Sequence, residues 1–360
     1  MVYIFFILIV ILWGGLKPPT STKYSQLLIH SFPIILLFVL IIGSQYRVGS
    51  DYLTYLDMFS GRVGLGYFDD KNELLFSNFI RVCRFIGITG QGIFFLLSFF
   101  WIIILLYAFG NFTKYRYVYI FVFLFVVFST AFNNQMNAVR QYTAVYVSLL
   151  LFISYIDKKY VVSVFLFAIS LFIHTSTIFL LPIFLLLWKY PVIENRKYQY
   201  LIVLSGLVFS LIYKDEWLFR FIDSAGVYTD FNRDNEFVKG VSGINKWTKY
   251  IYLPIFIISI YNCKLFKLSK RNKAFYTLGI YAYAIQMACI SSSVTVRFGM
   301  FFQIFQIIPI AYYLIYLRSS KKIINILIYA FVMLLMFFVY AVKVTFFAIG
   351  EYSYDSVFFH

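Results

Sequence analysis

The chain is a succession of long uncharged stretches separated by short polar segments. A helix needs about 20 residues to cross the roughly 30 Å hydrocarbon layer of a membrane, so each long stretch predicts a spanning helix. The uncharged stretches are 1–16, 24–46, 85–113, 117–139, 141–156, 160–188, 198–213, 250–263, 274–296, 298–317 and 323–342.

The stretch 160–188 is long for one crossing and short for two, and lysines flank both of its ends. We expect a hairpin of two short helices that meet near His174. The pattern therefore predicts an all-α, polytopic membrane protein with about 12 spanning helices, within a range of about 11 to 14. Residues 1–360 are expected to form a single integral-membrane domain with both termini on the outer side.

Two outer segments interrupt this pattern. Residues 44–73 form a charged loop, and in 74–86 apolar residues recur at helical spacing with arginines opposite them, which predicts an interfacial or re-entrant helix. Residues 214–248 form the largest hydrophilic loop. Its acidic run from Asp230 to Glu236 lacks the twelve-residue pattern of a calcium loop, so we interpret it as solvated and predict no metal site.

The charges are divided unevenly between the two sets of loops. One set holds 17 bases and only two acids, and the other holds 14 bases and 13 acids, so nearly all of the net charge of +16 lies on one side. The positive-inside rule places the basic set in the cytoplasm. With 62% hydrophobic and 13% charged residues, the chain is not a soluble domain. The bases adjoin apolar spans instead of forming a stripe, so we expect no nucleic-acid partner.

Four polar motifs then fall at the outer ends of helices. They are Arg47-Val48-Gly49-Ser50-Asp51-Tyr52-x-x-Tyr55, Asn133-Asn134-Gln135-x-Asn137-x-x-Arg140-Gln141, Phe172-x-His174-Thr175-Ser176 and Ser291-Ser292-Ser293-x-Thr295-x-Arg297-Phe298. An ionisable group near the bilayer is costly and therefore marks a candidate functional site. No Walker, GxSxG, HExxH or dinucleotide-binding pattern occurs in the sequence, so we expect no cofactor.

All three bases of these motifs are arginines, whose planar fork matches phosphate oxygens and keeps its charge when partly buried. The alternative is that each arginine only reaches the interface, caps a carbonyl, or, for Arg47, pairs with Asp51. His174 could serve as a general base or acid, or be a packing residue. Asp51 is the carboxylate candidate for activating a hydroxyl.

The four motifs, in this order over roughly residues 25–320, resemble the EpsG family of multi-pass, Wzy-like bacterial polymerases of exopolysaccharide, capsule and O-antigen. The tail Glu351-Tyr352-x-Tyr354 is a weaker match. The resemblance implies a fold related to membrane glycosyltransferases of the GT-C type. It also implies a metal-independent transfer of a growing glycan from undecaprenyl diphosphate onto a lipid-linked repeat unit, at the outer face of the bacterial cytoplasmic (inner) membrane.

The resemblance also assigns roles to residues. Arg140 and Arg297, with Arg47 as a third, would neutralise the departing diphosphate, and Asp51 or His174 would accept the proton. The sugar subsite would contain Tyr52, Tyr55, Asn137 and Gln141. A flippase and a chain-length regulator would be partners. A flippase or transporter, an O-antigen ligase and a membrane acyltransferase stay open as alternatives, as do the sugar, its linkage and its anomeric outcome.

Overall fold

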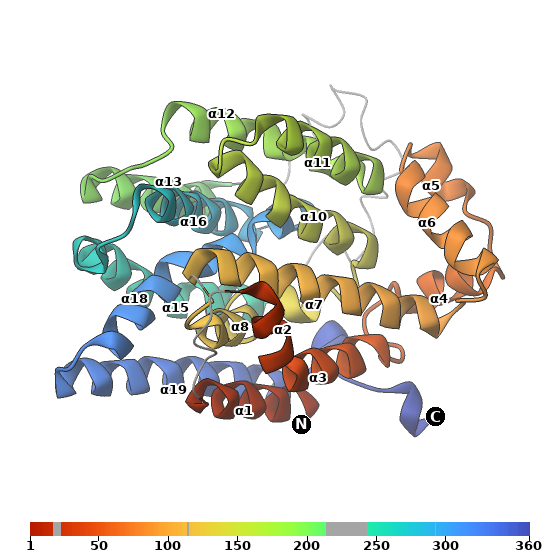
Figure 1. Cartoon of the computed structure of the whole chain (residues 1–360), viewed down its shortest axis with the longest axis horizontal. Helices are drawn as coiled ribbons and strands as arrows, with labels where there is room; N and C mark the ends of the chain where they lie inside the picture. The colour runs from red at the N-terminus through yellow and green to blue at the C-terminus, as the bar shows by residue number, and fades with distance from the viewer. Residues whose placement is uncertain (17–22, 114, 214–242, 292) are drawn as a thin grey trace. The chain divides into compact units, whose positions relative to one another are not determined.

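The computed structural model describes residues 1–16, 23–113, 115–213, 243–291 and 293–360 (Figure 1). These residues are mostly helical, and between them they form no strand beyond a single antiparallel bridge of Gln45 with Ser356. The all-α prediction is confirmed for this part of the chain. Packing divides it into two units, of which the first contains Met1–Leu181 with Leu327–His360 and the second contains Pro182–Ile326.

In the first unit the helices follow the order of the sequence. They are α1 (Val2–Gly15), α2 (Tyr24–His30), α3 (Phe32–Gly43), α4 (Tyr52–Ser60), α5 (Gly66–Asp70), α6 (Leu74–Phe85), α7 (Gln91–Thr113), α8 (Val118–Val127), α9 (Ala131–Asn134), α10 (Val139–Ile156), α11 (Tyr160–Ile173), the 3-10 helix η1 (Thr175–Leu180), most of α19 (Ile323–Phe346), η6 (Gly350–Tyr352) and η7 (Val357–Phe359).

The second unit contains most of α12 (Leu181–Lys189) and the helices between it and α19. They are α13 (Arg196–Ile212), α15 (Gly243–Asn262), η2 (Cys263–Phe266), α16 (Lys270–Ala288), η3 (Cys289–Ser291), α17 (Ser293–Gly299), η4 (Met300–Phe302), η5 (Phe305–Ile307) and α18 (Ile308–Ser319). Helices α13 and α16 pack against each other so closely that a Cβ on Gly206 would lie 2.2 Å from the carbonyl oxygen of Ala284. Glycine permits this approach because it has no side chain.

Among the described residues, three single helices are long and apolar enough to cross a membrane: α7, α10 and α19. Two bent pairs raise the number to five if each pair is one span. They are α2 with α3, bent by 67°, and Thr295–Phe302 with Phe305–Ser319, bent by 59°. The expected 12 crossings are therefore not confirmed. Several predicted spans are helices of only 10–17 residues, such as α1, α8 and α11.

The break predicted in 160–188 is present. Helix α11 ends at Ile173, His174 has the extended angles φ −153° and ψ 116°, and η1 begins at Thr175. The helix predicted after the first outer loop is also present as α6, with Phe76, Ile80 and Cys83 buried on one face. Most of the 214–248 loop, with its acidic run, lies outside the described residues.

The end of the chain fastens the loop that follows α3. The amide of Tyr46 donates to the carbonyl of Asp355 at 3.0 Å, and the amide of Val357 donates to the carbonyl of Ser44 at 2.8 Å. The Ser356 hydroxyl adds a bond of 2.9 Å to that of Ser44. The tail thus holds in place the loop that carries the first polar motif.

Candidate functional site

Glu73 joins two of the predicted site residues. It stands at the N-cap position of α6, and its side chain is only 1% exposed. Its Oε2 lies 2.5 Å from Nη1 of Arg140, and its Oε1 lies 2.7 Å from Nδ1 of His174. The carboxylate therefore links the first turn of α10 to the helix break at His174.

Several groups favour the charged form of this carboxylate. The backbone N–H and the hydroxyl of Thr175 donate to Oε1 at 3.2 and 3.4 Å. Burial by itself raises the pKa of Glu73, but the His174 hydrogen bond, the Arg140 charge and the Thr175 amide outweigh it, so this pKa lies below its usual value. Burying a charge is unfavourable unless it is paired and hydrogen-bonded, and here both conditions hold. The cluster is thus a carboxylate shared by a guanidinium and an imidazole.

Aromatic rings flank the guanidinium of Arg140. Its Cζ lies 5.4 Å from the ring centroid of Tyr67 and 5.0 Å from that of Phe68, which is cation–π distance. In the described part of the chain, no acceptor with hydrogen-bond geometry faces Nε of Arg140, although this atom is buried. A buried donor of this kind is costly to leave unpaired, so the arginine has capacity for an anionic ligand.

The first polar motif approaches the same end of α10. The side-chain oxygen of Asn137 accepts from the Asp51 amide at 2.9 Å and from the Ser50 hydroxyl at 3.4 Å. The Tyr55 hydroxyl accepts from the backbone N–H of Arg140 at 3.5 Å. Three predicted residues, Asp51, Tyr55 and Asn137, therefore gather beside Arg140, and Glu73 adds His174 to them.

Gly49 makes this approach possible. Its φ is +76°, and a Cβ there would lie 2.6 Å from the side-chain oxygen of Asn137. We expect Gly49→Ala to lower stability by roughly 1–3 kcal/mol through backbone strain and to reduce activity, because Asp51 would shift. Thermal unfolding measures the loss of stability, and a turnover assay measures the loss of activity. Gly64→Ala, in the loop between α4 and α5 and with nothing within 4 Å of a Cβ there, is the control; equal behaviour of the two variants would contradict the prediction.

The remaining predicted residues lie elsewhere. Tyr52 donates its hydroxyl to Gln91 on α7 at 2.8 Å and is buried. Arg47 is exposed, with Cζ 5.3 Å from the ring of Tyr46. The predicted alternative in which Arg47 pairs with Asp51 is wrong for the described structure, where Asp51 instead accepts from the Ser50 hydroxyl at 2.9 Å.

Gln141 is buried next to Arg140 at the start of α10. Arg297 is exposed on α17, in the second unit. Its convergence with Arg140 stays a prediction, as does the sugar-binding role of Gln141.

Sequence reasoning missed Glu73. It follows Asp69 and Asp70 at the end of a charged loop and directly precedes an apolar helix. An acidic residue in this position is normally a solvent-exposed helix cap. One signal in the sequence could have identified it: the Glu73 carboxylate lies in a loop predicted on the same outer side as Arg140 and His174, and could therefore pair with them. Within the described residues, no three His, Cys, Asp or Glu side chains are grouped to hold a metal ion.

The chain matches a known protein family. The EpsG family model matches residues 28–356, which is nearly the whole chain. The matched range includes the tail Glu351-Tyr352-x-Tyr354, beyond the part in which the four motifs occur. No curated protein and no solved structure matches the chain.

Proposed function

The chain belongs to the EpsG family, and on this premise we propose that it is a membrane glycosyltransferase that polymerises a bacterial surface polysaccharide. The donor is a growing glycan on undecaprenyl diphosphate, and the acceptor is a single lipid-linked repeat unit. The observation that carries the proposal is the group formed by the partly buried Arg140 and His174 around the buried Glu73, which combines an anion-binding cation with an oriented base.

Arg140 acts on the leaving group. When the bond between the anomeric carbon and the diphosphate oxygen breaks, negative charge develops on the diphosphate. A fixed guanidinium in a site with little water stabilises that charge in the transition state. Arg297 and Arg47 are proposed as further cations for the same diphosphate, in place of a metal ion.

His174 acts on the acceptor. Its Nδ1 is held by Glu73, so Nε2 is the ring nitrogen that would accept the proton of the attacking sugar hydroxyl. A base oriented by a carboxylate is the usual arrangement for activating a hydroxyl. The acceptor oxygen then forms the new bond to the anomeric carbon, and the diphosphate leaves. Direct displacement inverts this carbon. Retention would require a carboxylate nucleophile, for which Asp51 is the candidate.

Tyr55, Asn137, Gln141 and Tyr52 are proposed to shape the sugar subsite. Burial raises the pKa of Tyr55 to about 12, so its hydroxyl stays neutral and can form hydrogen bonds with a sugar. The charge pattern supports a site at the outer face of the cytoplasmic membrane, where a flippase would deliver repeat units and a chain-length regulator would act beside the polymerase.

The test is an assay with purified protein, one defined lipid-linked repeat unit, and a parallel reaction with chelator. We expect polymer in both reactions. His174→Asn, which keeps an N–H toward Glu73, is expected to lower turnover by about 10²–10⁴-fold at little cost in stability. Asp51→Asn separates the two candidate bases. We expect it to lower turnover less than His174→Asn does, and a larger loss in Asp51→Asn would make Asp51 the base.

The products also discriminate the alternatives. In cells, loss of a polymerase leaves single-repeat chains. Loss of a flippase leaves lipid-linked units facing the cytoplasm, and loss of a ligase leaves unattached polymer. Either of the last two outcomes would overturn the proposed activity.

A further inference from the structure

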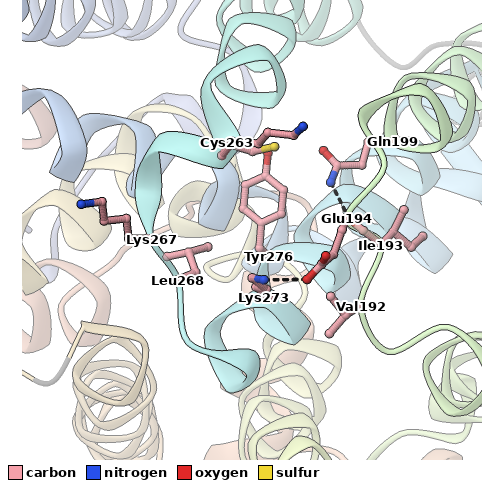
Figure 2. Close-up of a pocket in the computed structure, with 10 residues that line it drawn as sticks. Val192, Ile193, Glu194, Gln199, Cys263, Lys267, Leu268, Lys273 and Tyr276 are labelled. Carbon is pink, nitrogen blue, oxygen red and sulfur yellow. Dashed lines mark hydrogen bonds and ion pairs between the residues drawn. The ribbon is translucent and has the colours of Figure 1, made fainter.

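A cavity of about 330 Å³ lies within the second unit (Figure 2). Its wall is formed by the segment before α13, by η2 and the residues after it, and by the first turns of α16. It contains none of the residues proposed for glycosyl transfer. A ligand of this cavity would therefore bind apart from the residues proposed for glycosyl transfer.

Three lysines line the cavity: Lys264, Lys267 and Lys273. Nζ of Lys273 is 2.6 Å from the Glu194 carboxylate. Lys264 and Lys267 are exposed, and no carboxylate of the described residues lies within ion-pair distance of either. The cavity thus has an excess of positive charge. Both α13 and α16 begin beside it, and the N-terminal ends of helices add further positive potential.

Gln199 provides a second, independent observation. Its side chain is only 2% exposed, and its Nε2 donates to the carbonyl of Ile193 at 2.6 Å, which fixes the orientation of the amide. Its Oε1 is buried, and no hydrogen-bond donor of the described residues reaches it. Figure 2 shows the amide turned toward the ring of Tyr276 across the cavity. Buried acceptors are normally satisfied, so this oxygen indicates a ligand with a donor.

We propose that this cavity binds a phosphate ester that carries a free hydroxyl group. The phosphate lies against Lys264 and Lys267, and the hydroxyl donates to Oε1 of Gln199. Val192, Ile193 and Leu268 supply the apolar part of the wall. The glycerophosphate headgroup of phosphatidylglycerol has both features, as does a soluble polyol phosphate. Because the charge pattern predicts these loops on the cytoplasmic side, the ligand would come from the inner leaflet or the cytosol.

Native mass spectrometry of the purified full chain tests this proposal. Short-chain phosphatidylglycerol is titrated in detergent, with phosphatidylmethanol as an equally charged lipid without the hydroxyl and glycerol 3-phosphate as the soluble probe. We expect Lys264→Ala/Lys267→Ala to weaken phosphatidylglycerol binding about thirtyfold. Lys321→Ala/Lys322→Ala removes the same charge from exposed positions outside the cavity and should bind as the wild type does.

Gln199→Leu tests the hydroxyl contact. The wild type should prefer phosphatidylglycerol to phosphatidylmethanol, and the variant should lose this preference while it still binds both. Competition by glycerol 3-phosphate at comparable concentration would identify a soluble ligand, and its failure to compete would identify a lipid. Equal weakening by the two lysine pairs, or an unchanged preference in Gln199→Leu, would overturn the proposal. Polymerase activity enters none of these measurements.

Discussion

Glu73→Gln is expected to lower the turnover of polymer synthesis about 10²- to 10⁴-fold and stability by about 3–5 kcal/mol. The substitution keeps the shape of the side chain but removes the charge that Arg140 and His174 share. Arg140 would then be a partly buried cation without its counter-ion, which accounts for the loss of stability. His174 would lose the negative charge that stabilises its imidazolium when it takes the proton of the acceptor, which accounts for the loss of turnover.

A structural role alone can be distinguished by the pH profile. The negative charge of Glu73 favours the protonated imidazole of His174. Without this charge, the imidazole in Glu73→Gln should stay unprotonated, and able to act as a base, at a lower pH. The residual activity should therefore extend to lower pH. A purely structural residue would reduce the rate without moving the acid limb. Asp57→Asn is the matched control, since Asp57 pairs with Arg62 at 3.0 Å on the surface and both side chains are well exposed.

The stability of the wild type should also depend on pH, through the ionisation of Glu73. The pKa of Glu73 in the folded protein is lower than its ordinary value of 4.5. Its stabilising contribution is therefore complete above about pH 4.5 and is lost as the pH falls through the lower folded value. Thermal unfolding of wild type and Glu73→Gln should converge in acid. A difference that persists unchanged at low pH would place the effect of the substitution elsewhere.

Composition and charge could predict the helical class, the strongest spans and the break at His174, but not the two bent helix pairs or the early end of α8. Helices α7, α10 and α19 lie largely within stretches that the hydrophobic pattern identifies, although α10 also includes Arg140 and α19 also includes Lys343. However, a helix can end inside an uncharged stretch where a side chain makes hydrogen bonds to the backbone N–H and C=O groups at its end. In 117–139, α8 ends at Val127, and the Ser129 hydroxyl donates to the carbonyl of Phe125 at 2.6 Å and accepts from the amide of Ala131 at 3.1 Å. A search for uncharged stretches cannot detect where such a helix ends, because serine carries no charge.

The candidate site was predictable in part for a related reason. Arg140 and His174 stand out because each is an ionisable residue in an apolar context. Glu73 does not, since it lies in an acidic loop, and only the fold buries it. Asn137 was identified as polar, but its function of holding the Asp51 backbone amide and the Ser50 hydroxyl depends on the positive φ of Gly49, which sequence spacing does not reveal.

Arg140→Ala is expected to abolish polymer while single-repeat product persists. The side chain is 12% exposed, pairs with Glu73, and retains a buried Nε donor for a ligand. Removing a preorganised cation from a developing charge typically costs about 10²–10³ in turnover. Arg140→Lys keeps the charge but loses the planar fork, so most of the activity should still be lost. Arg62→Ala, which removes an exposed arginine, should leave chain length unchanged.

Because Arg140→Ala also leaves Glu73 as a buried charge without its cation, loss of polymer could reflect unfolding. The variant Glu73→Gln/Arg140→Met removes both charges and replaces the guanidinium with an apolar chain. Replacing a buried ion pair in this way is often neutral for stability, so the double variant should regain most of the stability that Arg140→Ala loses. It should nevertheless make no polymer, because the cation for the diphosphate and the negative charge beside His174 are both absent. A folded double variant with an unchanged chain-length distribution would remove Arg140 and Glu73 from the mechanism together.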